Sequence, residues 1–262
     1  MDRRTFLLTS SSFVLGNLLG LNSISKAFAF DHIDQNPRIK PRLALIIDDI
    51  GASFSHAKPF LDLNVPMTFA ILPRLPKSEE SASIIHSEGH EIMLHQPMEP
   101  RDRGLSPGPG ALYVGDELSK ISHIMEENIS FIPFATGMNN HMGSRFTASP
   151  KEMLETLQVV KDRGLFFVDS LTAGDSKGCK TAKTLQLPAT SRDVFLDNRV
   201  EESAIVRQLH QLKGIALRHG HAVGIGHPFV ETSRAIRHFL KGVKATEFEL
   251  VHMSDVLPAV AS

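Results

Sequence analysis

Short apolar segments alternate with longer amphipathic segments along most of the chain. The apolar segments are bounded by proline or glycine, which is typical of strands buried on both faces of a parallel sheet. The longer segments carry apolar residues at helical spacing, as Ile205, Leu209 and Leu212 do within residues 200–219. The pattern predicts strands at 43–47, 65–72, 91–94, 131–135, 165–168, 194–196, 222–225 and 249–252, and helices at 53–63, 78–89, 116–128, 149–164, within 175–185, and at 200–219 and 231–241.

This alternation predicts a single α/β domain with a parallel sheet, either closed like a barrel or open and doubly wound. In both architectures the chemistry takes place at the carboxyl ends of the strands. Residues 97–115 are rich in proline and glycine and are predicted to form a long loop, and loops of that length are often functional.

The first residues of the chain have the features of an export signal. Arg3 and Arg4 precede an apolar, serine-rich stretch and the small-x-small sequence Ala27-Phe28-Ala29, which predicts a signal of the twin-arginine type. An uncleaved membrane anchor is the alternative, but polar residues interrupt the apolar stretch. We therefore expect an export signal at 1–29, a linker at 30–40, a catalytic domain at 41–262, and a periplasmic or extracellular protein without a stable membrane span after processing.

Composition narrows the classes of function. The chain of 262 residues is 42% hydrophobic, enough to bury a large core, and its net charge of -1 does not suggest a protein that binds nucleic acid. Thirteen histidines stand against a single cysteine, Cys179. A disulfide within the chain is therefore impossible, and a metal site must be built from histidine and carboxylate groups.

Polar residues follow most of the predicted strands. The adjacent carboxylates of Asp48 and Asp49 repel each other and lose solvation, so we expect either a bound divalent cation or an aspartate that caps the next helix beside a surface aspartate. Capping does not explain histidines at strand ends, because histidine is not a favoured N-cap residue. A His/Asp metal site is therefore favoured over a set of structural histidines. The residues at predicted strand ends are Asp48, Asp49, His95, His141, Asp169, Ser170, Asp197, Asn198 and His227.

Several segments of the chain, in order, resemble the divergent polysaccharide deacetylase family, a branch of the polysaccharide deacetylases with the chitooligosaccharide-deacetylase homology fold. They cover essentially all of residues 41–258. The resemblance implies a distorted (β/α) barrel with about seven parallel strands. The matching segments are Ile47-Asp-Asp-Ile-Gly51, Pro66-Met-Thr-Phe-Ala70, Gly89-His-Glu-Ile-Met-Leu-His-Gln-Pro-Met-Glu99, Gly137-Met-Asn-Asn-His-Met-Gly-Ser144, Phe167-Val-Asp-Ser170, Arg192-Asp-Val-Phe-Leu-Asp197 and Gly226-His-Pro228.

The resemblance also implies roles for individual residues. Asp48 matches the catalytic base of the better-known deacetylases, and Asp49 and His95 match two metal ligands. Glu99 stands where those enzymes have their second ligand histidine, and their Arg-Pro-Pro-Tyr segment is replaced here by Asn139-Asn-His-Met-Gly143. We therefore predict His141 as the third ligand, with Glu99 as the alternative ligand or a group that supports the ligands.

The remaining roles concern acid catalysis and support of the site. His227 matches a histidine that acts as general acid, and Asp193 or Asp197 is expected to orient it, unless Asp197 caps the following helix. Asn140, Asp169 and Arg192 are further candidates for contacts with the ligands or the substrate.

The implied function is a metal-dependent hydrolase, with zinc as the expected metal, that removes acetyl groups from an envelope or extracellular polysaccharide or oligosaccharide. The lost second histidine keeps open a non-catalytic metal- or glycan-binding barrel. A metal hydrolase for another amide or ester is a third alternative.

Overall fold

A computed structural model describes residues 40–244 and 246–257. The predicted export signal and all but the last residue of the predicted linker lie outside the described residues. The strands are β1 (Arg42–Ile50), β2 (Thr68–Ile71), β3 (Glu91–Met98), β4 (Ala135–Met142), β5 (Phe166–Asp169), β6 (Ala189–Ser191), β7 (Val194–Phe195), β8 (His221–Gly226) and β9 (Glu249–Val251). The helices are α3 (Lys58–Leu61), α4 (Ser78–Ser87), α5 (Leu118–Phe131), α6 (Pro150–Asp162), α7 (Gly178–Thr184), α8 (Glu202–His219) and α9 (Val230–Gly242).

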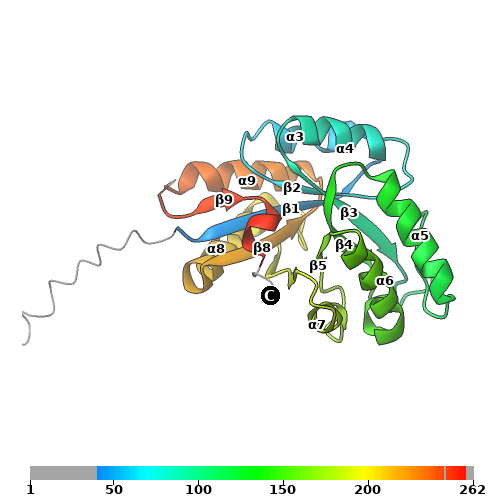
Figure 1. The fold of residues 1–262 in the computed structure, drawn as a ribbon. Coiled ribbons are helices and arrows are strands. Elements are labelled where there is room, and N and C mark those ends of the chain that lie inside the picture. The colour runs from blue at the N-terminus through cyan, green and yellow to red at the C-terminus, as the bar shows by residue number, and fades with distance from the viewer. Residues whose placement is uncertain (1–39, 245, 258–262) are drawn as a thin grey trace, which may run out of the picture. The chain divides into compact units, whose positions relative to one another are not determined.

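The described strands form one curled parallel sheet in the order β6-β5-β4-β3-β2-β1-β8-β7, with β9 added beside β1 (Figure 1). Every ladder between them is parallel. Among the described residues β6 and β7 are the two edges of this sheet, because no ladder joins them. The predicted fold class, a distorted (β/α) barrel, is confirmed. The sheet of the described residues has nine strands, against about seven implied by the resemblance, and β6 was not predicted from the sequence.

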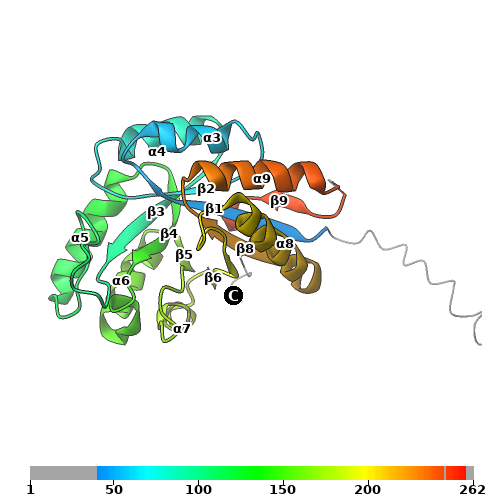
Figure 2. The same ribbon diagram turned by 180° about the vertical axis from the view of Figure 1, so that it is seen from behind.

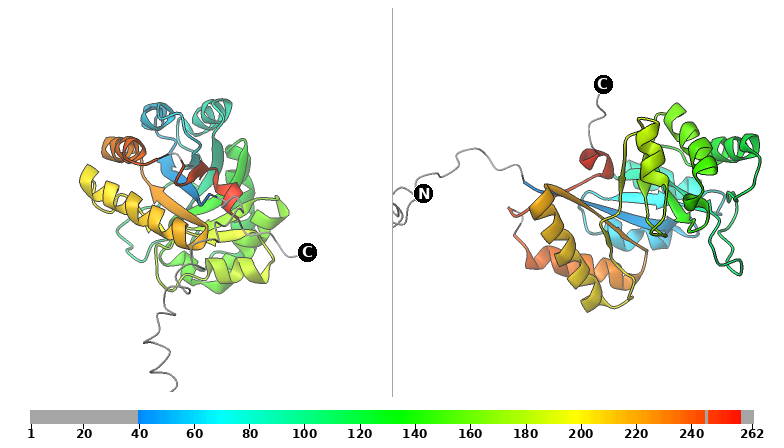
Figure 3. Two further views of the ribbon diagram at one scale, coloured as in Figure 1. Left: turned by 90° about the vertical axis from the view of Figure 1, so that its left-hand side faces the viewer. Right: turned by 90° about the horizontal axis from the view of Figure 1, so that it is seen from below.

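Two apolar layers hold the sheet in place. Successive side chains of a strand point to opposite faces, so alternate residues of β1, such as Ala44 and Ile46, fill the inside of the curl with Met93 and Phe166. The intervening residues pack under the helices, which lie around the outer face of the sheet (Figures 2 and 3). The side of each strand that a residue occupies therefore decides whether it can reach the space inside the curl.

Strand β4 differs from the prediction. The expected strand at 131–135 is wrong, because Phe131 is the last residue of α5 and the strand begins only at Ala135. Its inward positions carry Gly137, Asn139 and His141 in place of apolar side chains, so apolar periodicity could not reveal it. A strand lined with polar groups on its inner face indicates a site.

Glycine is required at position 137 by close packing. A Cβ atom at Gly137 would lie 2.3 Å from the ring of Phe166 on the neighbouring strand β5, well inside contact distance. The absence of a side chain on β4 thus makes room for the aromatic ring inside the curl.

Within residues 40–244 and 246–257, no helix is both long enough and apolar enough to cross a bilayer.

Candidate metal centre and active site

The backbone at the end of β1 brings two adjacent carboxylates to one site. In a regular strand Asp48 would follow Ile46 to the inner face, and Asp49 would point outward. Asp49 instead has a φ of 59°, in the left-handed region that aspartate tolerates better than most residues. The pairing of β1 with β2 also shifts its register between Ile47 and Ile50. Both carboxylates consequently face the carboxyl end of the sheet.

Asp49 meets two histidines from other strands. Its Oδ1 atom lies 3.1 Å from Nε2 of His95 on β3 and 2.9 Å from Nδ1 of His141 on β4. The same two nitrogen atoms are 3.2 Å apart. One ligand atom from each of these residues falls within 4.8 Å of the others, and the three form the one such group among the described residues.

The donor set fits a divalent metal ion. Asp49 Oδ1 is buried and accepts no hydrogen bond of normal geometry from the described residues, although two imidazole nitrogens face it. A carboxylate oxygen and two imidazole nitrogens that converge on one point are the arrangement that a bound cation requires. Two imidazoles and a carboxylate suit zinc among other divalent ions, and the group Asp49, His95 and His141 could therefore hold a metal.

Asn139 fixes the orientation of both Asp48 and His95. Its Nδ2 donates to Asp48 Oδ1 at 2.8 Å, so its Oδ1 is the atom that faces His95 Nδ1, at 2.7 Å. Because a carbonyl oxygen only accepts, His95 carries its proton on Nδ1. The other ring nitrogen, Nε2, faces Asp49 and His141 and is the one that would bind a metal ion.

Asp48 is buried next to the ligands without belonging to their group. It is 3% exposed, and its Oδ2 lies 3.6 Å from His95 Nε2. Burial raises the pKa of Asp48 above its ordinary value, against the charges of His95 and His227 and the hydrogen bond from Asn139. A carboxylate with a raised pKa beside a metal site is suited to accept a proton.

The pKa of Asp49 shifts in the direction opposite to that of Asp48. Burial alone would raise its pKa, but the neighbouring imidazoles of His141 and His95 outweigh burial and hold the pKa well below the ordinary value. Its carboxylate is therefore ionised throughout the neutral range, as a metal ligand must be. The two adjacent aspartates thus have different electrostatic properties.

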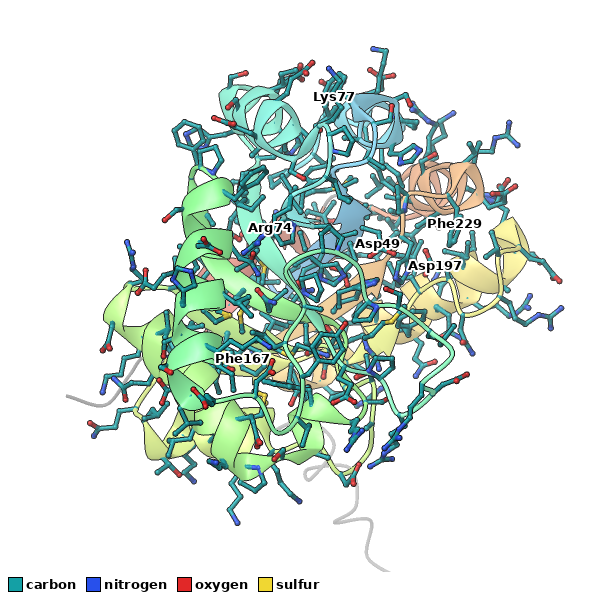
Figure 4. The ribbon with its side chains drawn as sticks, turned by 90° about the vertical axis from the view of Figure 1, so that its right-hand side faces the viewer. Asp49, Arg74, Lys77, Phe167, Asp197 and Phe229 are labelled. Carbon is teal, nitrogen blue, oxygen red and sulfur yellow. The ribbon has the colours of Figure 1, made fainter. Side chains whose placement is uncertain are left out.

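His227 follows β8 and forms a second pair with Asp197. Its Nδ1 is 3.0 Å from Asp197 Oδ1, and Asp197 Oδ2 accepts hydrogen bonds from the His227 backbone N–H and from the Thr232 hydroxyl at 2.8 Å. The free Nε2 of His227 lies 3.9 Å from Asp49 Oδ2. Figure 4 shows Asp49 and Asp197 in this region, with Phe229 beside them.

The charge on His227 depends on the carboxylate of Asp197. Burial lowers the pKa of His227, but the hydrogen bond to Asp197 and the nearby charges of Asp48, Asp197 and Asp49 outweigh it and raise the pKa to about 9. The imidazole is therefore protonated at neutral pH and can donate a proton from Nε2. Asp197 is not the cap of α8, whose N-cap residue is Glu201.

Other residues singled out from the sequence are placed elsewhere. Glu99 is not brought to the ligand group, because its carboxylate accepts hydrogen bonds from Arg145 at 2.7 Å and from the Val114 backbone at 2.8 Å. It fastens the long loop after β3. Asp193 accepts a hydrogen bond from the Val223 backbone N–H at 2.8 Å, so it supports the sheet edge and does not contact His227.

The side chains of Asn140 and Asp169 form hydrogen bonds with backbone groups. Asn140 occupies the outward side of β4, where its Oδ1 accepts from the Ser170 N–H and its Nδ2 donates to the Met142 carbonyl. Asp169 accepts from the Leu171 N–H at 3.0 Å and holds the turn after β5. The amide that does reach the ligands is its neighbour, Asn139. Alternation along β4 could have indicated this, since positions 139 and 141 share a face, had the strand been recognised.

Arg192 closes the gap between the sheet edges. Its guanidinium donates to the carbonyls of Ser170 and Leu171 and lies over the ring of Phe195, 5.1 Å from the centroid. Burial lowers its pKa, while the negative charges of Asp48 and Asp169 oppose the shift. Arg192 therefore contributes positive charge near the base as well as a link between β5 and β7.

A model of the family described as divergent polysaccharide deacetylase matches residues 45–257. The chain belongs to this family. Among its relatives is the uncharacterized protein YibQ of Escherichia coli (strain K12), which is 30% identical over 225 residues that cover 85% of this chain and 69% of that protein.

Solved structures place this chain among proteins of the same fold. An uncharacterized protein from Agrobacterium tumefaciens C58 is 27% identical with a TM-score of 0.77, over 83% of this chain and 89% of that one. The catalytic domain of a peptidoglycan N-acetylglucosamine deacetylase from Eubacterium rectale ATCC 33656 is 13% identical with a TM-score of 0.53, over 85% and 91%. The fold is thus shared with carbohydrate deacetylases.

Proposed function

We propose that this divergent polysaccharide deacetylase is a metal-dependent hydrolase that removes acetyl groups from an envelope or extracellular polysaccharide or oligosaccharide. The observation that carries the proposal is the position of the group Asp49, His95 and His141 between two titratable side chains of opposite function. The buried carboxylate Asp48 lies 3.6 Å from the ligand His95, and the protonated imidazole His227 lies 3.9 Å from the ligand Asp49.

The proposed metal is zinc, held by Asp49, His95 and His141. When bound, it would supply a Lewis acid for the acetyl carbonyl and lower the pKa of a water molecule. Asp48, held by Asn139, takes the proton of the attacking water as the new carbon–oxygen bond forms. The carbon–nitrogen bond then breaks, and the departing nitrogen takes the proton from His227 Nε2. Asp197 keeps that imidazole oriented and charged.

The experiment combines metal content with acetate release. Mature protein is reconstituted with zinc, and acetate is measured from chitooligosaccharides and peptidoglycan fragments. We expect one zinc per chain, with acetate release abolished in Asp48→Asn while zinc remains bound. Stoichiometric zinc without acetate from any of these glycans would reject the deacetylase and favour a non-catalytic metal- or glycan-binding barrel.

We also propose that the protein acts outside the cytoplasm, because the chain begins with the features of a twin-arginine export signal. Amino-terminal sequencing of protein from the periplasm or medium is expected to begin at Phe30. Protein that begins at Met1 or Asp2 and is confined to the cytoplasm would reject this location.

A further inference from the structure

A cavity of about 450 Å³ runs beside β7, one of the two sheet edges, and adjoins the active site. We call it the β7 cavity; it is lined by Arg192, Asp193, Val194, Phe195, Asn198, Gln208 and Gln211. Phe195 belongs to both places, since the centroid of its ring is 5.2 Å from that of the His227 imidazole. The cavity is therefore separated from His227 by the width of one aromatic ring.

The β7 cavity presents unused hydrogen-bonding groups. The side-chain amides of Asn198, Gln208 and Gln211 make no hydrogen bond with any other described residue. Each amide offers a carbonyl acceptor and two N–H donors. Three such groups converge on one space, with an aromatic ring at its border, so the lining can both donate to and accept from a ligand.

The charged groups of the lining are already committed to the protein. Arg192 donates to the Ser170 and Leu171 carbonyls, and Asp193 accepts from the Val223 N–H. Their formal charges also cancel. The groups left free are uncharged amides, which suit a neutral ligand rich in hydroxyl and amide groups better than an anion.

We propose that the β7 cavity binds the sugar unit next to the one that is deacetylated. This inference rests on the proposed function, because it assumes that an acetylated glycan occupies the space before His227. The volume lies within the usual range for small-molecule sites of about 300–1,000 Å³. The cavity thereby gives the protein a preference for oligosaccharides over single acetylated sugars.

The length of the glycan is the variable that tests this proposal. Binding of N-acetylglucosamine and of its β-1,4-linked tetramer is measured by calorimetry on zinc-loaded Asp48→Asn protein, in which turnover is blocked. We expect the tetramer to bind more tightly than the monosaccharide. The double substitution Gln208→Ala with Gln211→Ala removes two neutral hydrogen bonds and is expected to weaken tetramer binding about tenfold, with monosaccharide binding unchanged.

Gln158→Ala is the matched control. Gln158 is also a helical glutamine, but it lies on α6 and its amide donates to Asp162 at 2.8 Å. Alanine favours helix at all three positions, so loss of folding is not expected. Three results would overturn the proposal: equal tetramer binding in the double variant and its Asp48→Asn parent, an equal loss in the control, or a parent that binds the tetramer no better than the monosaccharide.

Acetate release, measured in parallel on protein with Asp48 intact, separates the two proposals. Acetate release without the effect of the double variant rejects the β7 cavity and leaves the deacetylase standing. Tetramer binding that depends on Gln208 and Gln211, without acetate release, supports the cavity and rejects the deacetylase.

Discussion

The left-handed backbone of Asp49 decides which side chains meet at the carboxyl end of the sheet. With ordinary strand geometry, Asp49 would point toward the helices and could not approach His95 or His141. A non-glycine residue in this conformation is uncommon and is found most often at functional sites. Met142 and Leu171 also have positive φ angles, of 54° and 49°, and both follow residues of the same region. Two of the seven non-glycine residues with positive φ in the described part of the chain are thus a ligand, Asp49, and the residue directly after a ligand, Met142.

Asn139 offers a test of ligand positioning. Asn139→Ala removes the acceptor that keeps the proton on His95 Nδ1 and the donor that holds Asp48. We expect zinc affinity to fall by about 10- to 100-fold, the usual effect of losing a partner of a metal ligand. Competition with a chromophoric chelator measures this affinity.

The neighbouring amide supplies the control. Asn140→Ala removes contacts with Ser170 and Met142 on the outward side of β4 and is expected to leave zinc affinity unchanged. An Asn139→Ala protein that binds zinc as tightly as the wild type would refute the proposed tautomer. Nitrogen chemical shifts of His95 in metal-free protein provide a second, direct measurement of the proton's position.

The raised pKa of His227 predicts that the free energy of unfolding depends on pH. Its pKa is about 9 in the folded chain against an ordinary 6.5, so the protonated form is favoured by folding. The resulting stabilisation is complete below about pH 6.5 and is lost as the pH rises through 9. In metal-free Asp197→Asn protein we expect the pKa to fall and this loss to disappear.

NMR titration of His227, together with urea unfolding at several pH values, checks this expectation. Asp193→Asn is the control, because Asp193 bonds to the Val223 backbone and does not contact His227. If the pKa of His227 stayed near 9 in Asp197→Asn, the charges of Asp48 and Asp49 would be its principal cause.

At the scale of the element, the packing of β4 against β5 requires glycine at position 137. Gly137→Ala would place a methyl group 2.3 Å from the ring of Phe166, inside a packed layer that offers few ways to relax. We expect the free energy of unfolding to fall by about 1–3 kcal/mol, the usual cost of overpacking. Urea denaturation measures it.

Gly174→Ala is the matched control, since a Cβ atom there would meet nothing within 4 Å and its φ is not positive. That variant is expected to unfold at the wild-type urea concentration. A Gly137→Ala protein that does the same would mean that Phe166 can leave the inner layer without cost.

The sequence predicts those elements whose stability comes from apolar burial. Strand β1 was predicted from its continuous apolar run and helix α8 from its periodicity, because the faces that they bury are apolar. Strand β4 was missed because its inner face is polar, and the amide of Asn139 was missed with it. The histidines were identified by type and position, but their distances depend on a register shift and on the φ of Asp49, which no periodicity reveals.

At the scale of the whole molecule, metal binding is expected to stabilise the fold, because its ligands lie on three different strands. Zinc at 100 times its dissociation constant adds about 2.7 kcal/mol, which corresponds to a rise of roughly 5–10 °C in melting temperature for a domain of this size. Scanning fluorimetry with and without zinc measures the rise. His141→Ala is expected to abolish it, and an equal rise in that variant would place the zinc at another site.

The β7 cavity and the metal ligands occupy different parts of the sheet. The metal ligands lie on β1, β3 and β4, none of which is an edge strand, and His227 follows β8, the strand next to β7. The β7 cavity lies at the edge, where substitutions disturb few ladders. We therefore expect members of this family to differ more often in the lining of the β7 cavity, and so in the glycans that it would accept, than in the three metal ligands.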